Sequence, residues 1–289
     1  MKEAVKNTIK KLASTHTEIN AEHYEIGKHV VIEDNVRITA KKLFIGDGVR
    51  INSGCRFEFT SDLFIGDYTA IKNNCFFSGT HWCYIGCNCW LGHYTVLDSI
   101  GTLYMGNNVG VGAHSQLWSH IKFGDVLEGS RFDSRKPLII DDDVWFVGHS
   151  IVSPIHAGEK SMALVGSVVT KDLECNKIYA GNPAVDISDR IGNQFAAVSN
   201  EDKKAKLIEY RQAFYNEYPQ HANSIEIVPE ITDVAKCQFS YVNRNYTKTL
   251  SRSEFHFVKF LFPDKAKFYP IAERNWVRRE FDRLYGDCL

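Results

Sequence analysis

The sequence lacks several features that mark common classes of protein. No apolar run reaches the roughly 18 residues needed to span a bilayer. The lysine-rich start, residues 1–14, has no apolar signal core. The formal net charge is only −1, so there is no bulk electrostatic case for binding nucleic acid or an anionic membrane. We therefore expect a cytoplasmic protein without a transmembrane segment that binds no nucleic acid.

The eight cysteines show no metal-binding pattern. Cys83, Cys87 and Cys89 form a cluster, but it lacks the paired spacing of a zinc finger or zinc ribbon. Cys55, Cys75 and Cys89 fall at small, inward positions of a repeat that runs through the chain, where a buried thiol packs well. The sequence therefore favours core packing for the thiols, and we expect no metal.

This repeat is the main signal in the sequence. An aliphatic residue followed by glycine returns every 19 or 20 residues from Ile26 to Met105. Another apolar residue stands six positions later, and a third stands six positions after that. Three six-residue sides close one triangular coil, and successive coils bury their apolar residues on one another. The three columns are Ile26, Ile45, Ile65, Ile85 and Met105; Ile32, Ile51, Ile71, Leu91 and Val111; and Ile38, Phe57, Phe77, Leu97 and Leu117.

The repeat is interrupted once. From Met105 to Ile140 is 35 residues instead of 20, so about 15 residues are extruded between Trp118 and Pro137. Loops of this length without an internal pattern are usually functional or disordered. The interruption therefore marks a candidate functional segment.

The pattern predicts an all-β solenoid of about seven coils between two other segments. We expect a capping helix over residues 1–22, the solenoid over 23–187 with an extruded loop over 118–137, and a mixed α/β extension over 188–289. Within the extension, helices are predicted near residues 201–218, 254–262 and 272–284, because apolar residues recur there at helical spacing.

Together, several segments resemble the hexapeptide-repeat acyltransferases, which include maltose, galactoside and xenobiotic acetyltransferases and cell-surface sugar O-acetyltransferases. The resemblance covers residues 24–187 and is carried by the repeat and by segments 118–120, 143–148, 165–172 and 180–184. It implies a left-handed parallel β-helix that transfers an acetyl group from acetyl-coenzyme A to a hydroxyl or amine. It also implies a homotrimer with its active site between subunits.

The resemblance implies that His120 is the general base, which takes the acceptor proton during attack on the thioester. An imidazole suits this role near neutral pH, and general-base catalysis contributes on the order of 10²–10⁴ in rate. Direct attack needs no enzyme nucleophile, so the lack of a Ser-His-Asp pattern is no objection. An ordinary loop histidine is the alternative. The rivals His114 and His149 occupy equivalent positions in their coils and should stack on one face.

The resemblance also implies contacts with acetyl-coenzyme A and with the acceptor. The cofactor residues are Trp145, Gly148, Gly166, Ser167, Thr170, Lys171, Ala180, Gly181 and Asn182. The family commonly has Lys or Arg after the last of these segments, where this chain has Val185 and Asp186, so the group that holds the 3′-phosphate stays open. Trp118 could stack on a sugar ring, and Asp125 and Glu128 could orient the acceptor or His120.

The leading hypothesis is acetyl transfer to a carbohydrate, in cell-surface polysaccharide or nucleotide-sugar metabolism. A zinc hydratase or hydrolase of the γ-carbonic-anhydrase type is one alternative, with His81, His114 and His120 as possible ligands, although that family's paired spacing is not matched. A non-enzymatic β-helix scaffold is the other.

Overall fold

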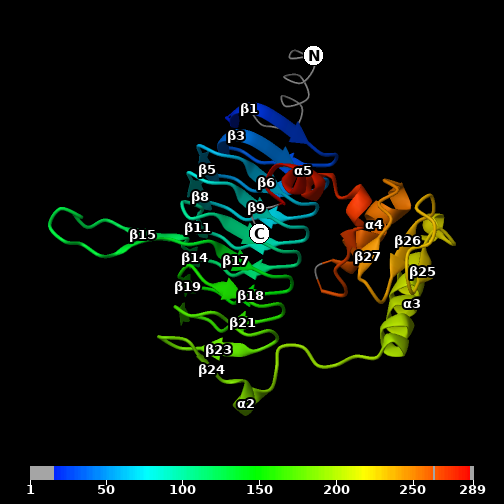
Figure 1. Cartoon of the computed structure of the whole chain (residues 1–289). Helices are drawn as coiled ribbons and strands as arrows, with labels where there is room; N and C mark the ends of the chain where they lie inside the picture. Colours follow the sequence, from blue (N-terminus) through cyan, green and yellow to red (C-terminus); the bar gives the residue numbers. More distant parts are fainter. Residues whose placement is uncertain (1–15, 263, 287–289) are drawn as a thin grey trace. The chain divides into compact units, whose positions relative to one another are not determined.

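The computed structural model describes residues 16–262 and 264–286, which form two units (Figure 1). The first unit ends at Phe195 and the second begins at Ala196. The sequence placed this boundary at 187–188. Residues 188–195 stay with the first unit because the Asn176 side chain accepts from Phe195 N at 2.8 Å and donates to Phe195 O at 2.9 Å.

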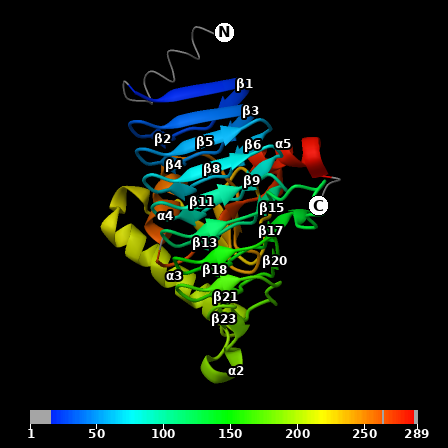
Figure 2. The same ribbon diagram turned by 90° about the vertical axis from the view of Figure 1, so that its left-hand side faces the viewer.

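The first unit is a three-sided prism of short parallel strands, stacked coil upon coil (Figure 2). Its first face contains β3 (Arg37–Ile45), β6 (Leu63–Ile65), β9 (Cys83–Ile85), β12 (Leu103–Met105), β17 (Leu138–Ile140) and β20 (His156–Ala157). The second contains β2 (Val31–Ile32), β4 (Arg50–Ile51), β7 (Ala70–Ile71), β10 (Trp90–Leu91), β13 (Gly110–Val111), β18 (Trp145–Phe146), β21 (Met162–Ala163) and β23 (Ile178–Ala180). The third contains the start of β3, β5 (Arg56–Phe59), β8 (Phe76–Gly79), β11 (Val96–Asp98), β14 (Gln116–Leu117), β19 (Ile151–Val152) and β22 (Val168–Val169).

The apolar columns of the repeat form the interior of the prism. Ile45 pairs with Ile65 on the first face, and Leu97 pairs with Leu117 on the third. All four side chains are buried in one hydrophobic cluster. Stacking identical positions in adjacent coils removes each apolar side chain from water, and this burial is the main favourable term for such a solenoid.

The cysteines of the repeat point into this interior, as predicted. Cys55, Cys75 and Cys89 are buried, and so are Cys83 and Cys87. Burial raises the pKa of the Cys83 thiol, and the charge of Asp98 acts in the same direction. These thiols therefore behave as small core residues.

Glycine is required where successive coils come close together. A Cβ at Gly66 would lie 2.6 Å from the carbonyl carbon of Gly86, well inside van der Waals contact. Beside these glycines, a side-chain oxygen bridges neighbouring coils. Asp67 Oδ1 accepts from Asp47 N at 2.8 Å, and Asn107 Oδ1 accepts from Cys87 N at 2.9 Å. The Gly-Asp and Gly-Asn pairs of the repeat thus join one coil to the next.

The first described strand corrects one prediction. The sequence assigned residues 1–22 to a capping helix, but residues 18–22 belong to β1 (Glu18–Ile26), which pairs in parallel with β3. Ile19 lies opposite Ile38 and packs against the core cluster, so pairing with the first coil outweighs local helix propensity. Residues 1–15 of the predicted helix lie outside the described part of the chain.

The predicted extruded loop is an arm that leaves the prism between β14 and β17 (Figure 1). Its root is an antiparallel pair, β15 (His120–Lys122) with β16 (Asp133–Arg135). The apolar side chains along it are exposed: Ile121, Phe123, Val126, Leu127 and Phe132. The last coil ends in β24 (Val185–Asp186), which pairs antiparallel with β23, and in the short helix α2 (Ser188–Ile191).

The second unit combines helices with a four-stranded sheet and has its own aromatic core, which includes Phe214, Phe239 and Phe257. Its elements are α3 (Asn200–Glu217), η1 (Pro219–His221), β25 (Glu226–Val228), β26 (Gln238–Ser240), β27 (Asn245–Tyr246), α4 (Arg252–Leu261), β28 (Tyr269–Pro270), η2 (Ala272–Arg274) and α5 (Trp276–Tyr285). The predicted helices are therefore confirmed. Among the described residues, no helix is long and apolar enough to cross a membrane.

Candidate active site

His120 lies where the arm leaves the prism. The last ladder bond before it joins Trp118 N to Val152 O at 2.9 Å. Two residues later, His120 begins β15 and pairs with Arg135 across the arm. The histidine is therefore fixed on one side by the prism and on the other by the arm, at the point that the interrupted repeat singled out.

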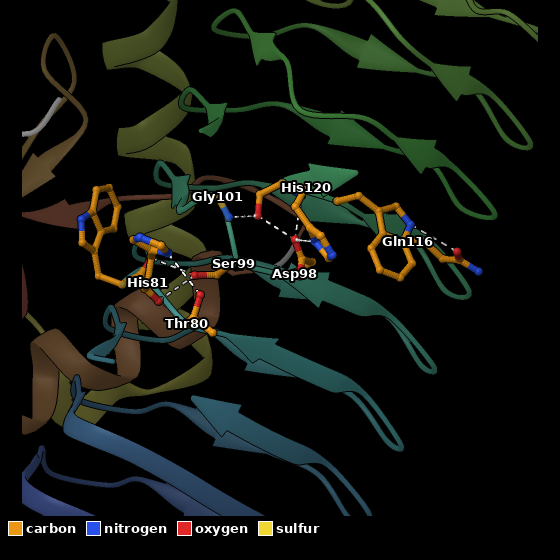
Figure 3. Close-up of polar contacts among 10 residues, drawn as sticks. Thr80, His81, Asp98, Ser99, Gly101, Gln116 and His120 are labelled. Atoms are coloured by element: carbon orange, nitrogen blue, oxygen red, sulfur yellow. Dashed lines mark hydrogen bonds and ion pairs between the residues drawn. The ribbon is translucent and has the colours of Figure 1, made fainter. Parts of the chain in front are cut away.

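Asp98 is the hydrogen-bonding partner of His120, and Figure 3 shows the two side chains pointing toward each other. Asp98 Oδ2 lies 2.8 Å from His120 Nδ1. The residue Asp98 is only 2% exposed, whereas the His120 side chain is 22% exposed. The buried carboxylate thus anchors an imidazole that solvent can still reach.

Ser119 completes this arrangement. Its N–H donates to Asp98 Oδ2 at 3.0 Å, and its Oγ donates to the same oxygen at 2.7 Å. Gly101 N in turn donates to Ser119 Oγ at 2.8 Å. Because the Ser119 Oγ accepts from an amide, its own proton is directed to Asp98. Three donors therefore converge on Asp98 Oδ2: the Ser119 N–H, the Ser119 hydroxyl and the His120 ring.

This network selects one tautomer of His120. A carboxylate only accepts hydrogen bonds, so Nδ1 carries the proton that bonds to Asp98. The other ring nitrogen, Nε2, is then an acceptor and can take a proton from a bound hydroxyl or amine. The geometry can perform general-base chemistry without an enzyme nucleophile.

Of the three candidates for binding the acceptor, Trp118 lies beside His120, whereas Asp125 and Glu128 lie further along the arm. The Trp118 ring meets the His120 ring edge to face, with centroids 6.4 Å apart, and its Nε1 donates to Gln116 Oε1 at 3.3 Å. Asp125 and Glu128 are exposed in the arm, where Asp125 Oδ1 accepts from Leu127 N at 2.8 Å. Within one chain, Asp98 of the prism rather than an arm carboxylate contacts His120 Nδ1, so the expectation that Asp125 or Glu128 orients the acceptor or His120 stays a prediction.

Three of the cofactor candidates lie on the corner between the second and third faces. Gly148, Gly166 and Gly181 all have positive φ there, with φ values of 149°, 73° and 100°. Gly166 N donates to Gly148 O at 2.9 Å, and Val168 N donates to Gly181 O at 2.9 Å. A Cβ at Gly166 would meet nothing within 4 Å. Gly166 and Gly181 are exposed and leave an open strip along this corner, whereas Gly148 is buried beside it, with Ala113 O 3.4 Å from where its Cβ would lie.

The remaining cofactor candidates surround this strip or lie away from it. Trp145 is partly exposed on β18, and its indole lies over Gly110, where a Cβ would come within 2.9 Å of the ring. Ala180 ends β23, and Asn182 follows Gly181 with a cis bond to Pro183. Thr170 and Lys171 are exposed after β22, at the corner that carries the arm.

Ser167 does not fit its predicted role. Its side chain is buried, and Oγ donates to Leu164 O at 2.6 Å. It belongs to the inward column of small residues that also contains Ser115 and Ser150, so a surface-bound cofactor cannot contact the hydroxyl.

His114 and His149 stack, as predicted, with ring centroids 4.9 Å apart, and Tyr94 extends the stack at 5.0 Å from His114. All three have positive φ at the corner that carries Gly148. His120 lies at another corner of the same chain. Within the described part of the chain, no three His, Cys, Asp or Glu side chains are grouped to hold a metal ion.

Asp98 and Ser119 are the candidate site residues that sequence reasoning did not include. Asp98 lies 22 residues before His120, and only the register of the coils brings them together. Because Leu97 pairs with Leu117, Asp98 falls beside Trp118 in the adjacent coil. The position of Asp98, one coil before Trp118 in the repeat, is the feature of the sequence from which this contact could have been predicted.

Some known proteins are similar to part of this chain in sequence. No protein-family model matches the chain. "Putative acetyltransferase C18B11.09c" of Schizosaccharomyces pombe is 36% identical over 92 residues, 31% of this chain and 44% of that protein. "Putative acetyltransferase SACOL2570" of Staphylococcus aureus is 34% identical over 76 residues, 26% of this chain and 38% of that protein. The chain thus spans less than half the length of these curated relatives.

Among solved structures, the polysialic acid O-acetyltransferase OatWY aligns with a TM-score of 0.46 at 16% identity, over 63% of this chain and 91% of that one. AntD, an N-acyltransferase of Bacillus cereus solved with dTDP and coenzyme A, aligns with a TM-score of 0.44 at 17% identity, over 75% and 97%. The prism is a parallel β-helix, as the sequence predicted, and both sequence relatives carry the name "Putative acetyltransferase".

Proposed function

We propose that the protein transfers an acetyl group from acetyl-coenzyme A to a hydroxyl or amine of a carbohydrate, in polysaccharide or nucleotide-sugar metabolism. The observation that carries this proposal is the pairing of His120 with the buried carboxylate of Asp98. The names of the sequence relatives point to the same reaction class.

In this mechanism His120 Nε2 accepts the proton of the acceptor while the acceptor oxygen or nitrogen bonds to the acetyl carbonyl carbon. The carbon–sulfur bond of the thioester would then break, and the proton on His120 would go to the departing thiolate. Asp98 holds the tautomer and stabilises the positive charge that develops on the ring. Ser119 and Gly101 fix the carboxylate, so little reorganisation is needed during the reaction. The coenzyme supplies an activated acyl thioester.

The strip that Gly166 and Gly181 leave open, with Gly148 buried beside it, would hold the slender pantetheine arm of the coenzyme. A side chain at Gly166 would fill space that is empty at present, since a Cβ there meets nothing within 4 Å. Trp145, Ala180 and Asn182 would border the ligand, and Thr170 and Lys171 are exposed for its polar groups. Trp118 beside His120 would support the sugar ring.

We also propose that the site is completed between copies of the chain in a homotrimer. Within one chain, His120 and the glycine strip lie on different corners, with the third face between them. The arm presents exposed apolar side chains, including Phe123, which is 102% exposed, and Leu127, which is 92% exposed. Apolar surface of this kind on a two-stranded arm favours a protein contact.

The test is acetyl transfer measured by release of free coenzyme A and by the mass of the product, with acceptors that include neutral, acidic and amino sugars. Wild-type protein should transfer acetyl, and His120→Ala should lower kcat by about 10²–10⁴. His156→Ala is a matched control, because His156 also lies 2.8 Å from a carboxylate, Asp141, but belongs to β20 and not to the root of the arm. Equal transfer by wild type and His120→Ala would refute the role of His120.

A further inference from the structure

A second group of side chains suited to chemistry lies in the C-terminal unit. Ser253 Oγ is 3.0 Å from His221 Nδ1, and His221 Nε2 is 2.8 Å from His256 Nδ1. Ser253 and His256 belong to α4, whereas His221 ends η1. A hydroxyl, an imidazole beside it and a third group that holds the imidazole are the arrangement of an activated nucleophile.

The surroundings of the hydrogen-bonded residues Ser253, His221 and His256 favour an activated serine nucleophile. His221 is only 7% exposed, and the Phe214 ring stacks on it at 5.6 Å with 4° between the planes. Ser253 and His256 are partly exposed, so a small substrate can reach the hydroxyl. Burial lowers the pKa of His256, and the charges of His221, Arg252 and Lys259 lower it further. A neutral His256 can accept the Nε2 proton of His221, which leaves Nδ1 to accept from Ser253.

The start of α4 also supplies donors for a developing negative charge. Ser251 is the N-cap, and its Oγ accepts from Glu254 N at 3.2 Å. The first backbone bond at this end joins Phe255 N to Ser251 O at 3.1 Å. The helix itself therefore offers no acceptor to the N–H groups of Arg252 and Ser253. Two amide donors at a positive helix end, next to a serine nucleophile, suit an oxyanion.

We propose that Ser253 and His221 form a second active site, in which His256 is a positioning residue and which hydrolyses small carboxylic esters. Ser253 Oγ bonds to the acyl carbon while its proton passes to His221 Nδ1, and the alcohol leaves with that proton. Water then attacks the acyl-serine, gives one proton to His221, and releases the carboxylic acid as Ser253 regains its proton. This reaction requires neither coenzyme A nor His120, so it stands apart from the acetyltransferase proposal.

The test uses the full chain, p-nitrophenyl acetate as substrate, and a fluorophosphonate that labels activated serines. Wild type should hydrolyse the ester and carry the phosphonyl adduct on Ser253, as located by peptide mass spectrometry. Ser253→Ala removes the nucleophile that His221 activates and should lower the rate by about 10²-fold or more. Ser199→Asn, which keeps the N-cap of α3 away from this site, should retain both the rate and the adduct.

For the positioning residue, His256→Gln should lower kcat while leaving KM for the ester unchanged, a split that a loss of packing alone does not produce. Absence of the adduct on Ser253 in wild-type protein would overturn the proposal, whether or not the variants fold. Equal hydrolysis by wild type and a folded Ser253→Ala protein would also overturn it.

Discussion

Among single residues, replacing Asp98 tests whether this carboxylate orients His120 or instead helps to bind substrate. In Asp98→Asn, the amide nitrogen can donate to His120 Nδ1 and so favour the tautomer with its proton on Nε2, which cannot act as a base. We expect kcat to fall about 10- to 100-fold. KM for acetyl-coenzyme A should be unchanged, because Asp98 is buried and reaches the reaction only through His120. Steady-state kinetics measure both quantities.

The matched control is Asp141→Asn, which alters the exposed pair of Asp141 and His156 and should leave kcat unchanged. An Asp98→Asn enzyme with wild-type kcat would show that the carboxylate does not set the tautomer. A rise in KM with no change in kcat would place Asp98 in binding instead.

His120 and Asp98 show how much of the candidate site could be predicted from the sequence. His120 could be predicted because it stands where a regular repeat breaks. Asp98 could not be identified from its neighbours in the sequence, because its role arises from the register that pairs Leu97 with Leu117. Ser167 was assigned wrongly for a related reason. Ser167 was chosen because it lies in a segment that resembles the family. The inward direction of its hydroxyl depends on how the coils stack, which the segment alone does not show.

Among the secondary-structure elements, the root of the arm leaves no room for an added side chain at Gly101. A Cβ at Gly101 would overlap Ser119 O and lie 2.6 Å from Lys136 O, so Gly101→Ala must displace the strand that carries His120. We expect a loss of about 1–3 kcal/mol in the free energy of unfolding. Acetyl transfer should fall more than stability alone predicts, because Gly101 N also bonds to Ser119.

Denaturant titration and transfer kinetics on the folded variant measure these two effects. Gly286→Ala is the matched control, since the nearest atom to its Cβ would be 3.7 Å away. Unchanged transfer in folded Gly101→Ala would mean that the arm root does not position His120.

The contact between η1 and α4 makes the second unit sensitive to acid. The pKa of His256 is lowered in the folded state, chiefly by burial and then by the charges of His221, Arg252 and Lys259. Unfolded histidine titrates near 6.5, so below about pH 6.5 the unfolded chain binds more protons and stability falls as pH falls. Ser253, and Tyr218 with its ring 6.1 Å from His256, are neutral neighbours that offset none of this positive charge.

Thermal unfolding of the full chain between pH 7.5 and 5.5 tests this expectation. The second unit should melt at a lower temperature at the acidic end, and His256→Gln should reduce that dependence on pH. A melting temperature that rises as pH falls would contradict the assigned direction.

The secondary-structure elements that could be predicted are those with a periodic pattern of apolar residues. The coils were predictable because each repeats the same burial, and the helices α3, α4 and α5 because their apolar faces have helical spacing. The pairing of β25, β26, β27 and β28 was not, because two-residue and three-residue strands carry too little pattern to define partners. The strand β1 was misassigned because its pairing with β3 is a tertiary preference.

For the whole chain, we expect a trimer with about three times the monomer mass of 32.9 kDa. The double substitution Phe123→Ser and Leu127→Ser removes apolar surface from the arm and should shift the protein toward monomers, with a parallel loss of acetyl transfer. Light scattering coupled to size-exclusion chromatography measures the mass. A wild-type monomer with full activity would rule out a site shared between copies.

The central claim, that His120 acts as the base for acetyl transfer from coenzyme A, is tested most directly by a crystal structure of the protein with coenzyme A and an acceptor sugar. The account predicts that the coenzyme follows the strip of Gly166 and Gly181, beside Gly148, in one chain. It also predicts that an acceptor hydroxyl or amine lies about 2.6–3.2 Å from His120 Nε2 of the same or a neighbouring chain. A coenzyme bound elsewhere, or with its sulfur out of reach of any molecule bonded to His120, would contradict it.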